Sequence, residues 1–219
     1  MRPPLPILLS INGGYVDTAG FLALQGLFTA HVTGNFVTLG AALVFGTTGV
    51  VAKLIALPVF CLVVGTVRLL GNALTARGAS PLRVLLWLQS VLLFAGFALA
   101  MRLGPFRNGD AWPALVTGMT LVCAMAVQNG AQRIHLPSAP PSTLMTGNTT
   151  QVVIDIVDLL RGMPDTQAAA TVRGRLSRMA TSVVSFAGGC AAAALLFAFT
   201  GMWCFALPPL VALAAVAWL

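Results

Sequence analysis

The sequence predicts an all-α polytopic membrane protein with two pseudo-symmetric, inverted repeats: six full spans and two short half-helices. Three observations lead to this fold class. The 219 residues are 58% hydrophobic and only 8% charged, whereas soluble domains carry roughly 25% charged residues. Several apolar runs approach the ~20 residues that cross a bilayer as a helix. The triplet Thr-Gly-Asn at 33–35 returns at 146–148, at the start of another apolar run.

The net charge of +7 comes from twelve Lys and Arg residues against five Asp and Glu residues. In membrane proteins such basic residues lie in loops and set the orientation of the chain. The longest polar stretch, 161–178, holds four arginines and is expected to be a cytoplasmic loop beside anionic lipid headgroups. The expected partner is therefore the lipid bilayer, and no nucleic acid is expected.

Eight apolar segments follow one another along the chain. The first, after Arg2, lacks a nearby small-residue cleavage site, so we expect an uncleaved membrane segment rather than a signal peptide. Irregular stretches at 71–81 and 104–110 separate some of the others. The segments are predicted at 5–28, 33–50, 53–70, 82–103, 112–133, 146–160, 179–200 and 202–219.

The order of these segments predicts one transmembrane domain, 1–219, made of repeat 1 (about 5–103) and repeat 2 (about 112–219). A polar residue precedes each triplet at a similar spacing: Asp17 stands 16 residues before Thr33, and Asn129 stands 17 before Thr146.

Small residues are expected to let the membrane helices approach closely. Gly65 in the third segment and Gly188 and Gly189 in the seventh are the candidates. The same faces would allow a homodimer.

Segments 33–50 and 146–160 each have only about 15 clearly helical residues, too few for a full crossing. The proline-rich stretch 136–143 before the second one cannot be helical. Non-helical backbone at membrane depth is tolerated only where protein buries it or where it lines a wet cavity. The two segments are therefore predicted to be half-helices that begin at Thr-Gly-Asn after an extended approach.

The distribution of basic residues discriminates between two possible topologies. Eight spans place eight basic residues inside and four outside, and give parallel repeats. Six spans with two half-helices place nine inside and three outside (Lys53, Arg102 and Arg107), and give inverted repeats. The positive-inside rule favours the second topology, which is a transporter architecture. The eight-span topology stays open.

The triplets are candidate binding sites because a helix start exposes free N–H groups and about half a positive charge. Thr33 and Thr146 are predicted N-caps, the glycines would admit a ligand to the backbone, and the asparagines supply donors and acceptors. The alternative is that each triplet merely starts a membrane helix. The predicted substrate-binding residues are Thr33, Gly34, Asn35, Thr146, Gly147, Asn148, Gln128 and Asn129.

Asp17 lies within an apolar helix, where a carboxylate costs at least ~2.5 kcal/mol and usually has a function. Together with His31 it is the predicted proton-coupling pair. An interfacial or structural role is the alternative for each residue. Asp155 and Asp158 share one face of their segment; a surface pair with Arg161 is expected for Asp158, and the role of Asp155 stays open.

Enzyme signatures are absent from the sequence: it has no phosphate-binding loop, no His-Glu-x-x-His and no Gly-x-Ser-x-Gly. We therefore predict no catalytic residues, no metal site and no cofactor. Free packing cysteines are expected, because none has metal-ligand spacing: Cys61, Cys123, Cys190 and Cys204.

The motifs resemble those of a known family. The runs 14–17 and 28–35, then Gln-Asn-Gly at 128–130 and Met-Thr-Gly-Asn at 145–148, are similar to the YoaK-like family, integral membrane proteins with a domain of unknown function. The resemblance covers nearly the whole chain and implies a multi-pass protein of the bacterial inner membrane. It implies little about the substrate.

The pattern favours a secondary transporter of a small polar or anionic solute, bound between two half-helix N-termini, with coupling to protons. A passive channel for a small solute or ion is one alternative. An intramembrane enzyme or accessory subunit using His31 and Asp17 is another, and it would need a further titratable partner.

Overall fold

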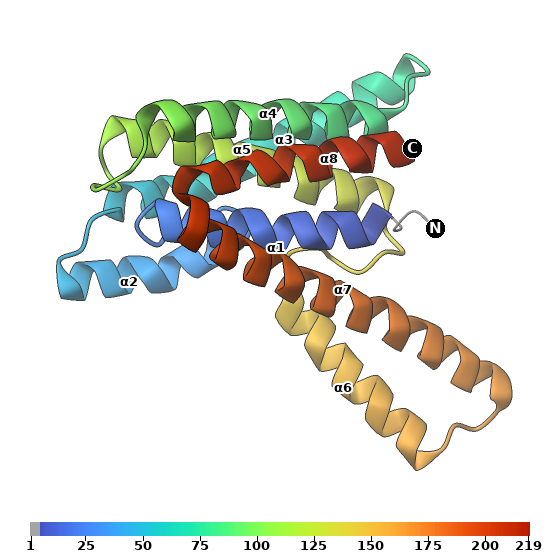
Figure 1. Ribbon diagram of the computed structural model, residues 1–219. Coiled ribbons are helices and arrows are strands. Elements are labelled where there is room, and N and C mark those ends of the chain that lie inside the picture. The colour runs from blue at the N-terminus through green and yellow to red at the C-terminus, as the bar shows by residue number, and fades with distance from the viewer. Residues whose placement is uncertain (1–4) are drawn as a thin grey trace.

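The structure is a computed structural model that describes residues 5–219, and every regular element within them is helical (Figure 1). The predicted all-α class is confirmed. Arg2, which the charge count placed inside, lies outside the described residues. In chain order the elements are α1 (Leu5–Ala23), η1 (Val32–Gly34), α2 (Asn35–Phe45), α3 (Val50–Ala76), α4 (Pro81–Leu103), α5 (Trp112–His135), α6 (Met145–Arg161), α7 (Thr166–Thr200), η2 (Gly201–Ala206) and α8 (Leu207–Trp218).

The helices α1, α3, α4, α5 and α8 run side by side and give the bundle two distinct ends (Figure 1). Figure 1 shows the start of α1 and the C-terminus at the same end. Leu5 packs there with Leu86 and Val216, and Arg83 donates a hydrogen bond to the Leu219 carbonyl at 2.7 Å. We call this the terminal end. The opposite end, which holds the start of α3 and the loop between α4 and α5, is the Asp110 end.

Within residues 5–219, four stretches are long and apolar enough to cross a membrane: 50–76, 81–103, 112–135 and 166–218. The last contains α7, η2 and α8, and Figure 1 shows the chain reversing between α7 and α8. The chain is therefore a multi-pass helical protein. The four candidate spans do not by themselves establish the predicted six full spans or the inverted repeats.

Glycines set the closest helix contact, between α1 and α7. A Cβ atom on Gly189 would lie 2.2 Å from the Ile11 carbonyl oxygen, and one on Gly14 would lie 2.2 Å from the Phe186 carbonyl oxygen. Any side chain there would force the backbones apart. The expectation for Gly189 is confirmed. Gly65 and Gly188 have no atom within 4 Å of such a Cβ and mediate no close approach inside the chain.

Two predicted loop boundaries are wrong. The stretch 161–178 is not one long loop, because α7 begins at Thr166. The Asp165 carboxylate caps this start by accepting from the Ala168 N–H at 2.6 Å, and the following alanines favour helix. Likewise α3 continues to Ala76, so most of 71–81 is helical.

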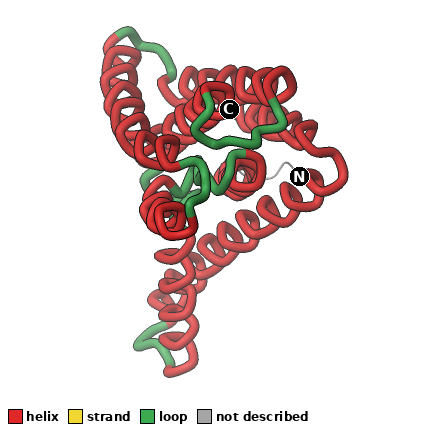
Figure 2. Tube along the Cα trace, turned by 90° about the vertical axis from the view of Figure 1, so that its left-hand side faces the viewer, coloured by secondary structure: helices red, strands yellow, loops and turns green. Residues whose placement is uncertain are grey.

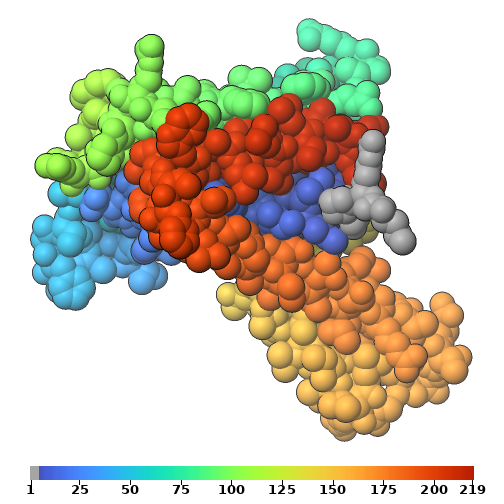
Figure 3. Space-filling model, in the orientation of Figure 1, coloured from blue at the N-terminus to red at the C-terminus, as the bar shows by residue number. Residues whose placement is uncertain are grey.

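The two short segments are short helices, and neither has the predicted threonine cap. The helix α2 has 11 residues and α6 has 17, and no side chain caps either start. The N-caps are Gly34 and Leu144, while Thr33 lies in η1 and Thr146 already lies inside α6. Non-α-helical chain precedes both helices: residues 24–34, which end in η1, lead into α2, and residues 136–144 lead into α6. We call these the first and second irregular segments. Figures 2 and 3 show α6 and the first part of α7 standing away from the bundle as a hairpin.

Candidate functional site

A cavity of about 380 Å³ lies between α3, α5 and the irregular segments that precede α2 and α6. Its apolar wall comes mainly from α3 and from the proline-rich segment. Its polar groups come from α5 and the two irregular segments. The lining residues are Ala30, His31, Val32, Thr33, Leu57, Phe60, Val64, Asn129, Gly130, Gln132, Arg133, Leu136, Pro137, Ala139, Pro141, Thr143 and Leu144.

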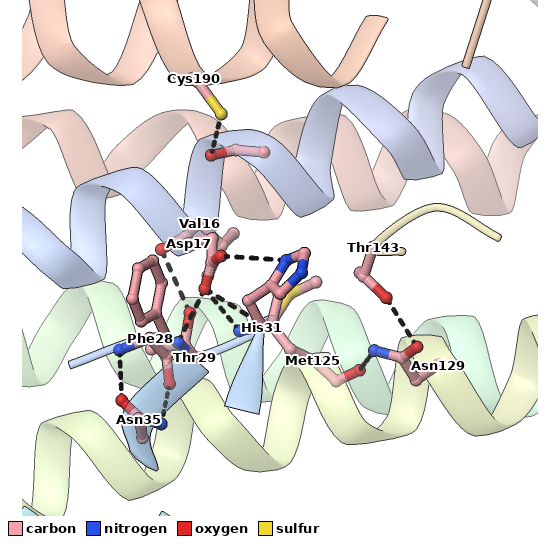
Figure 4. A network of polar contacts seen from close by, with 12 residues as sticks. Val16, Asp17, Phe28, Thr29, His31, Asn35, Met125, Asn129, Thr143 and Cys190 are labelled. Atoms are coloured by element: carbon pink, nitrogen blue, oxygen red, sulfur yellow. Dashed lines mark hydrogen bonds and ion pairs between the residues drawn. The ribbon is translucent and has the colours of Figure 1, made fainter. Parts of the chain in front are cut away.

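Asn35 shapes the first irregular segment by holding the backbone seven residues earlier. Its Oδ1 accepts from the Phe28 N–H at 2.9 Å, and its Nδ2 donates to the Phe28 carbonyl at 2.8 Å (Figure 4). A Cβ on Gly34 would lie 3.0 Å from the Phe28 ring. The triplet at 33–35 therefore closes the loop onto the start of α2.

Asp17 holds the same segment from α1. Its Oδ1 accepts from the N–H groups of Thr29 and Ala30, both at 2.8 Å, and of His31 at 3.2 Å (Figure 4). The other carboxylate oxygen lies 3.9 Å from Nδ1 of His31. Asp17 is buried and does not line the cavity, whereas His31 does. His31 therefore stands between the buried acid and the cavity.

Asn148 repeats the role of Asn35 in the second half. Its Nδ2 donates to the Pro141 carbonyl at 2.9 Å, again seven residues earlier. Proline has no N–H group, so the second bond that Asn35 makes to Phe28 has no counterpart here. Both asparagines are nearly fully buried. The shared residue of the two triplets thus has a shared structural task.

Neutral amides on α5 take the position that Asp17 has on α1. Asn129 accepts from the Thr143 hydroxyl at 2.8 Å and donates to the Met125 carbonyl at 3.2 Å. Gln132 donates to the Pro140 carbonyl at 2.7 Å and accepts from the Ser142 N–H at 3.0 Å. The second irregular segment is therefore held without a carboxylate.

Gln128 lies in a buried polar cluster beside the cavity and does not line it. Its Oε1 accepts from Gln89 at 2.6 Å and from Asn12 at 3.4 Å. Its Nε2 donates to the Leu9 carbonyl and to Ser142, both at 2.9 Å. These bonds tie α1, α4 and α5 to the second irregular segment.

The structure brings three of the predicted residues to the cavity: Thr33, His31 and Asn129. Asp17, Asn35, Asn148 and Gln128 lie behind its wall and hold it in shape. Thr146 and Gly147 lie on the exposed face of α6, away from the cavity. The two helix starts therefore do not point together into this cavity; the segments that precede them meet there.

Sequence reasoning missed Gln132, Arg133 and Thr143. Arg133 counted only as an orientation-setting basic residue, although it follows Asn129 by four positions and so shares its helix face. That spacing is a signal in the sequence. Thr143 carried no signal of its own, because a proline-rich segment has no periodicity that would assign a face.

At the Asp110 end, a carboxylate that no sequence pattern singled out holds the start of α3. Asp110 accepts from the N–H groups of Gly49, Val50, Val51 and Ala52 at 2.8–3.3 Å, and so caps α3. Burial by itself raises the pKa of Asp110, but these four donors outweigh it and leave the pKa below its usual range.

Other contacts complete the closure of the Asp110 end. Lys53 donates to the Gln25 carbonyl at 2.9 Å, and the Gln25 side chain donates to the Phe106 carbonyl at 2.9 Å.

Asp155 is fully buried and pairs with Arg175, so it joins α6 to α7. It also accepts from Gln151 at 2.8 Å. The expected pair of Asp158 and Arg161 does not form among the described residues; the charge of Asp158 acts on Arg175. Asp155 is therefore occupied away from Asp17 and His31, and cannot serve them as a third titratable partner.

Within residues 5–219, no three metal-ligating side chains cluster, and the cysteines are free thiols.

These features define the class of the protein: a multi-pass, all-helical membrane protein with a partly polar cavity walled by two irregular segments. A family profile described as "Protein of unknown function (DUF1275)" matches residues 5–218, and the chain belongs to this family. It is 29% identical over 165 residues to the UPF0700 transmembrane protein YoaK of Bacillus subtilis (strain 168), which covers 71% of this chain and 67% of that protein. No solved structure matches the chain.

The comparisons confirm the YoaK-like resemblance that the motifs indicated. Family membership and the apolar helices together identify a multi-pass protein of the bacterial inner membrane.

Proposed function

We propose that this protein is a secondary transporter of a small polar or anionic solute, which binds in the cavity beside His31, Thr33 and Asn129. The observation that carries the proposal is the cavity itself. Its polar groups converge from α5 and from two irregular segments, and its volume lies in the range of small-molecule sites. Irregular backbone that lines a cavity at the membrane midplane is typical of secondary transporters.

The contacts between helices support a pair of inverted repeats, 5–103 and 112–219. The first helix of each repeat packs on the third helix of the other: α1 lies along α7, and α5 lies along α3. Each short helix follows an irregular segment that an asparagine holds seven residues back. In this proposal α2 and α6 are half-helices that return to opposite ends of the bundle.

The basic residues support an orientation with the terminal end in the cytoplasm. The cavity extends from Leu57, in the first half of α3, to Arg133 and Pro137 near that end, whereas hydrogen bonds join the elements at the Asp110 end. In this proposal the cavity opens towards the terminal end, as an inward-facing state of alternating access requires. Basic residues toward the terminal end are Arg68, Arg77, Arg83, Arg133, Arg161, Arg173, Arg175 and Arg178; those toward the Asp110 end are Lys53, Arg102 and Arg107.

Asp17 and His31 are the proposed coupling pair. His31 lines the cavity, and its Nδ1 lies 3.9 Å from Asp17. Asp17 in turn fixes the backbone of 29–31, part of the cavity wall. A change of charge at this pair would therefore act directly on the wall that holds the solute.

The test is uptake into proteoliposomes under an imposed proton gradient, with trapped pH dye and a panel of small carboxylates, amino acids and polyols. We expect saturable uptake of one class of these solutes, together with acidification of the liposome lumen. Asp17→Asn should abolish accumulation, while binding of that solute to the purified variant, measured by thermal shift, persists. Asp158→Asn, an exposed acid outside the cavity, is the matched control.

Two outcomes would contradict the proposal. Wild-type flux that never exceeds the external concentration and does not saturate would identify a passive channel instead. Accumulation by Asp17→Asn with unchanged pH dependence would remove the coupling role of the acid.

A further inference from the structure

The cavity has an excess of unused hydrogen-bond donors. No hydrogen bond or ion pair joins the Arg133 guanidinium to another described residue, and the same holds for the Thr33 hydroxyl. Arginine alone offers five N–H donors in a planar fork. The side-chain amides of Asn129 and Gln132 each donate one N–H to a backbone carbonyl of the protein, which leaves a second N–H available. Thr33 and Arg133 are exposed residues, so the cavity offers a solute donors for which its own side chains supply no acceptor.

The acceptors of the same side chains are already occupied. The Oδ1 atom of Asn129 accepts from Thr143, and the Oε1 atom of Gln132 accepts from the Ser142 N–H. No carboxylate lines the cavity, because Asp17 lies behind His31. Arg133 is therefore a cation whose charge no lining residue neutralises.

Another part of the cavity wall is apolar. Leu57, Phe60 and Val64 of α3 lie on it, together with side chains of the two irregular segments. A compact inorganic oxyanion would leave this wall bare, whereas an organic acid with a hydrocarbon body would cover it and gain the free energy of apolar burial. One guanidinium matches one carboxylate in a bidentate pair.

We infer that Arg133 anchors the anionic group of the solute and that the solute is a small organic monocarboxylate with an apolar body. The inference rests on the proposed function and names its substrate class. The carboxylate lies against Arg133 with Gln132 and Thr33 nearby, and the hydrocarbon body lies against Phe60.

Binding to the purified wild-type protein tests the inference with three probes: phenylacetate, its neutral isostere phenylacetamide, and inorganic sulfate. We expect phenylacetate to bind at least about tenfold more tightly than either of the others, as a charge-assisted pair predicts. Arg133→Gln should remove this preference for the acid over the amide, and Arg133→Lys should retain part of it. Arg107→Gln, which changes an exposed arginine at the Asp110 end, should leave the preference intact.

A cavity-filling variant distinguishes failure of the carboxylate inference from failure of the proposed transporter function. Under the proposed function, Val64→Trp abolishes solute accumulation in proteoliposomes. If it does so while Arg133→Gln keeps an unchanged preference for phenylacetate, the carboxylate inference fails and the transporter stands. If the wild type binds phenylacetamide as tightly as phenylacetate, the carboxylate inference likewise fails and the transporter stands. If Val64→Trp accumulates solute normally in a folded protein, the cavity is not the transport site and both fail.

Discussion

At the scale of residues, the repeated asparagine does a different task from the one its motif suggested. Asn35 and Asn148 do not open helix starts to a ligand; each holds the backbone seven residues earlier and so fixes an irregular segment at the cavity. The partner differs between the halves, since Phe28 offers both a donor and an acceptor and Pro141 only an acceptor. Asp17 adds a charge that the second half replaces with amides.

Asp110 yields a stability prediction at this scale. Asp110→Ala removes the acceptor for the N–H groups at the start of α3 and should destabilise the protein by about 0.5–2 kcal/mol, the usual cost of a lost helix cap. The measurement is thermal unfolding in detergent at neutral pH. Asp158→Ala, an exposed acid of α6, is the matched control and should unfold like the wild type.

The same carboxylate predicts the direction of a pH effect. The pKa of Asp110 is lowered in the folded protein, so its stabilisation is fully present above the unfolded value of ~3.9. The stabilisation is lost as the pH falls through the folded pKa. The difference in unfolding temperature between wild type and Asp110→Ala should therefore shrink as the pH is lowered below ~4. A difference that grows on acidification would contradict the capping role.

How far the sequence predicted these residues depends on how local their partners are. Asp17 and His31 stood out because polar groups in apolar helices are costly, and the structure does bring them together. Asp110 accepts from the N–H of Gly49, which lies 61 positions earlier in the chain. No local sequence pattern could therefore reveal this contact. Arg133 lay within a helical period of Asn129, yet its position on a cavity wall depends on α3.

At the scale of elements, the α6–α7 hairpin is the part of the fold that stands away from the bundle (Figure 3). A carboxylate buried between two helices needs a partner, and Arg175 supplies it for Asp155. The Gln151 side chain also donates a hydrogen bond to Asp155. The ion pair and the packing of α6 along α7 hold the hairpin together.

Arg175→Ala should therefore loosen the hairpin locally. It leaves Asp155 buried with only Gln151 as a partner, while the half-exposed position of Arg175 limits the cost to about 1 kcal/mol. Hydrogen exchange should become faster along α6 and unchanged in α4. Arg173→Ala, a nearby exposed arginine, is the control. Unchanged protection of α6 in Arg175→Ala would show that apolar contacts alone hold the hairpin.

At the scale of the whole molecule, the two ends of the bundle differ in what closes them. At the Asp110 end, hydrogen bonds join the segment after α1, the start of α3 and the loop between α4 and α5. Near the terminal end, the cavity is walled by a proline-rich segment. This asymmetry supports the proposed transporter, because alternating access requires the two ends to differ in any one state.

Access to the cavity should therefore come from one side only. In a background without the native cysteines, Thr33→Cys should react with a membrane-impermeant maleimide in inside-out vesicles and not in right-side-out vesicles. Thr47→Cys, at the Asp110 end, is the control and should show the opposite pattern. Equal labelling of Thr33→Cys from both sides would indicate a continuous channel, and labelling only from outside would reverse the proposed orientation.

The sequence by itself determined the class of this protein: a helical, multi-pass chain with two short helices after irregular segments. These properties follow from composition, apolar run length and proline placement, which act locally. Only the tertiary structure decided where the cavity lies, which polar residues face it and which end is closed. Those properties depend on contacts between residues far apart in the chain, such as Asp110 with the start of α3. The triplet Thr-Gly-Asn pointed to the right region because it shapes the cavity wall, although most of its residues do not face the cavity.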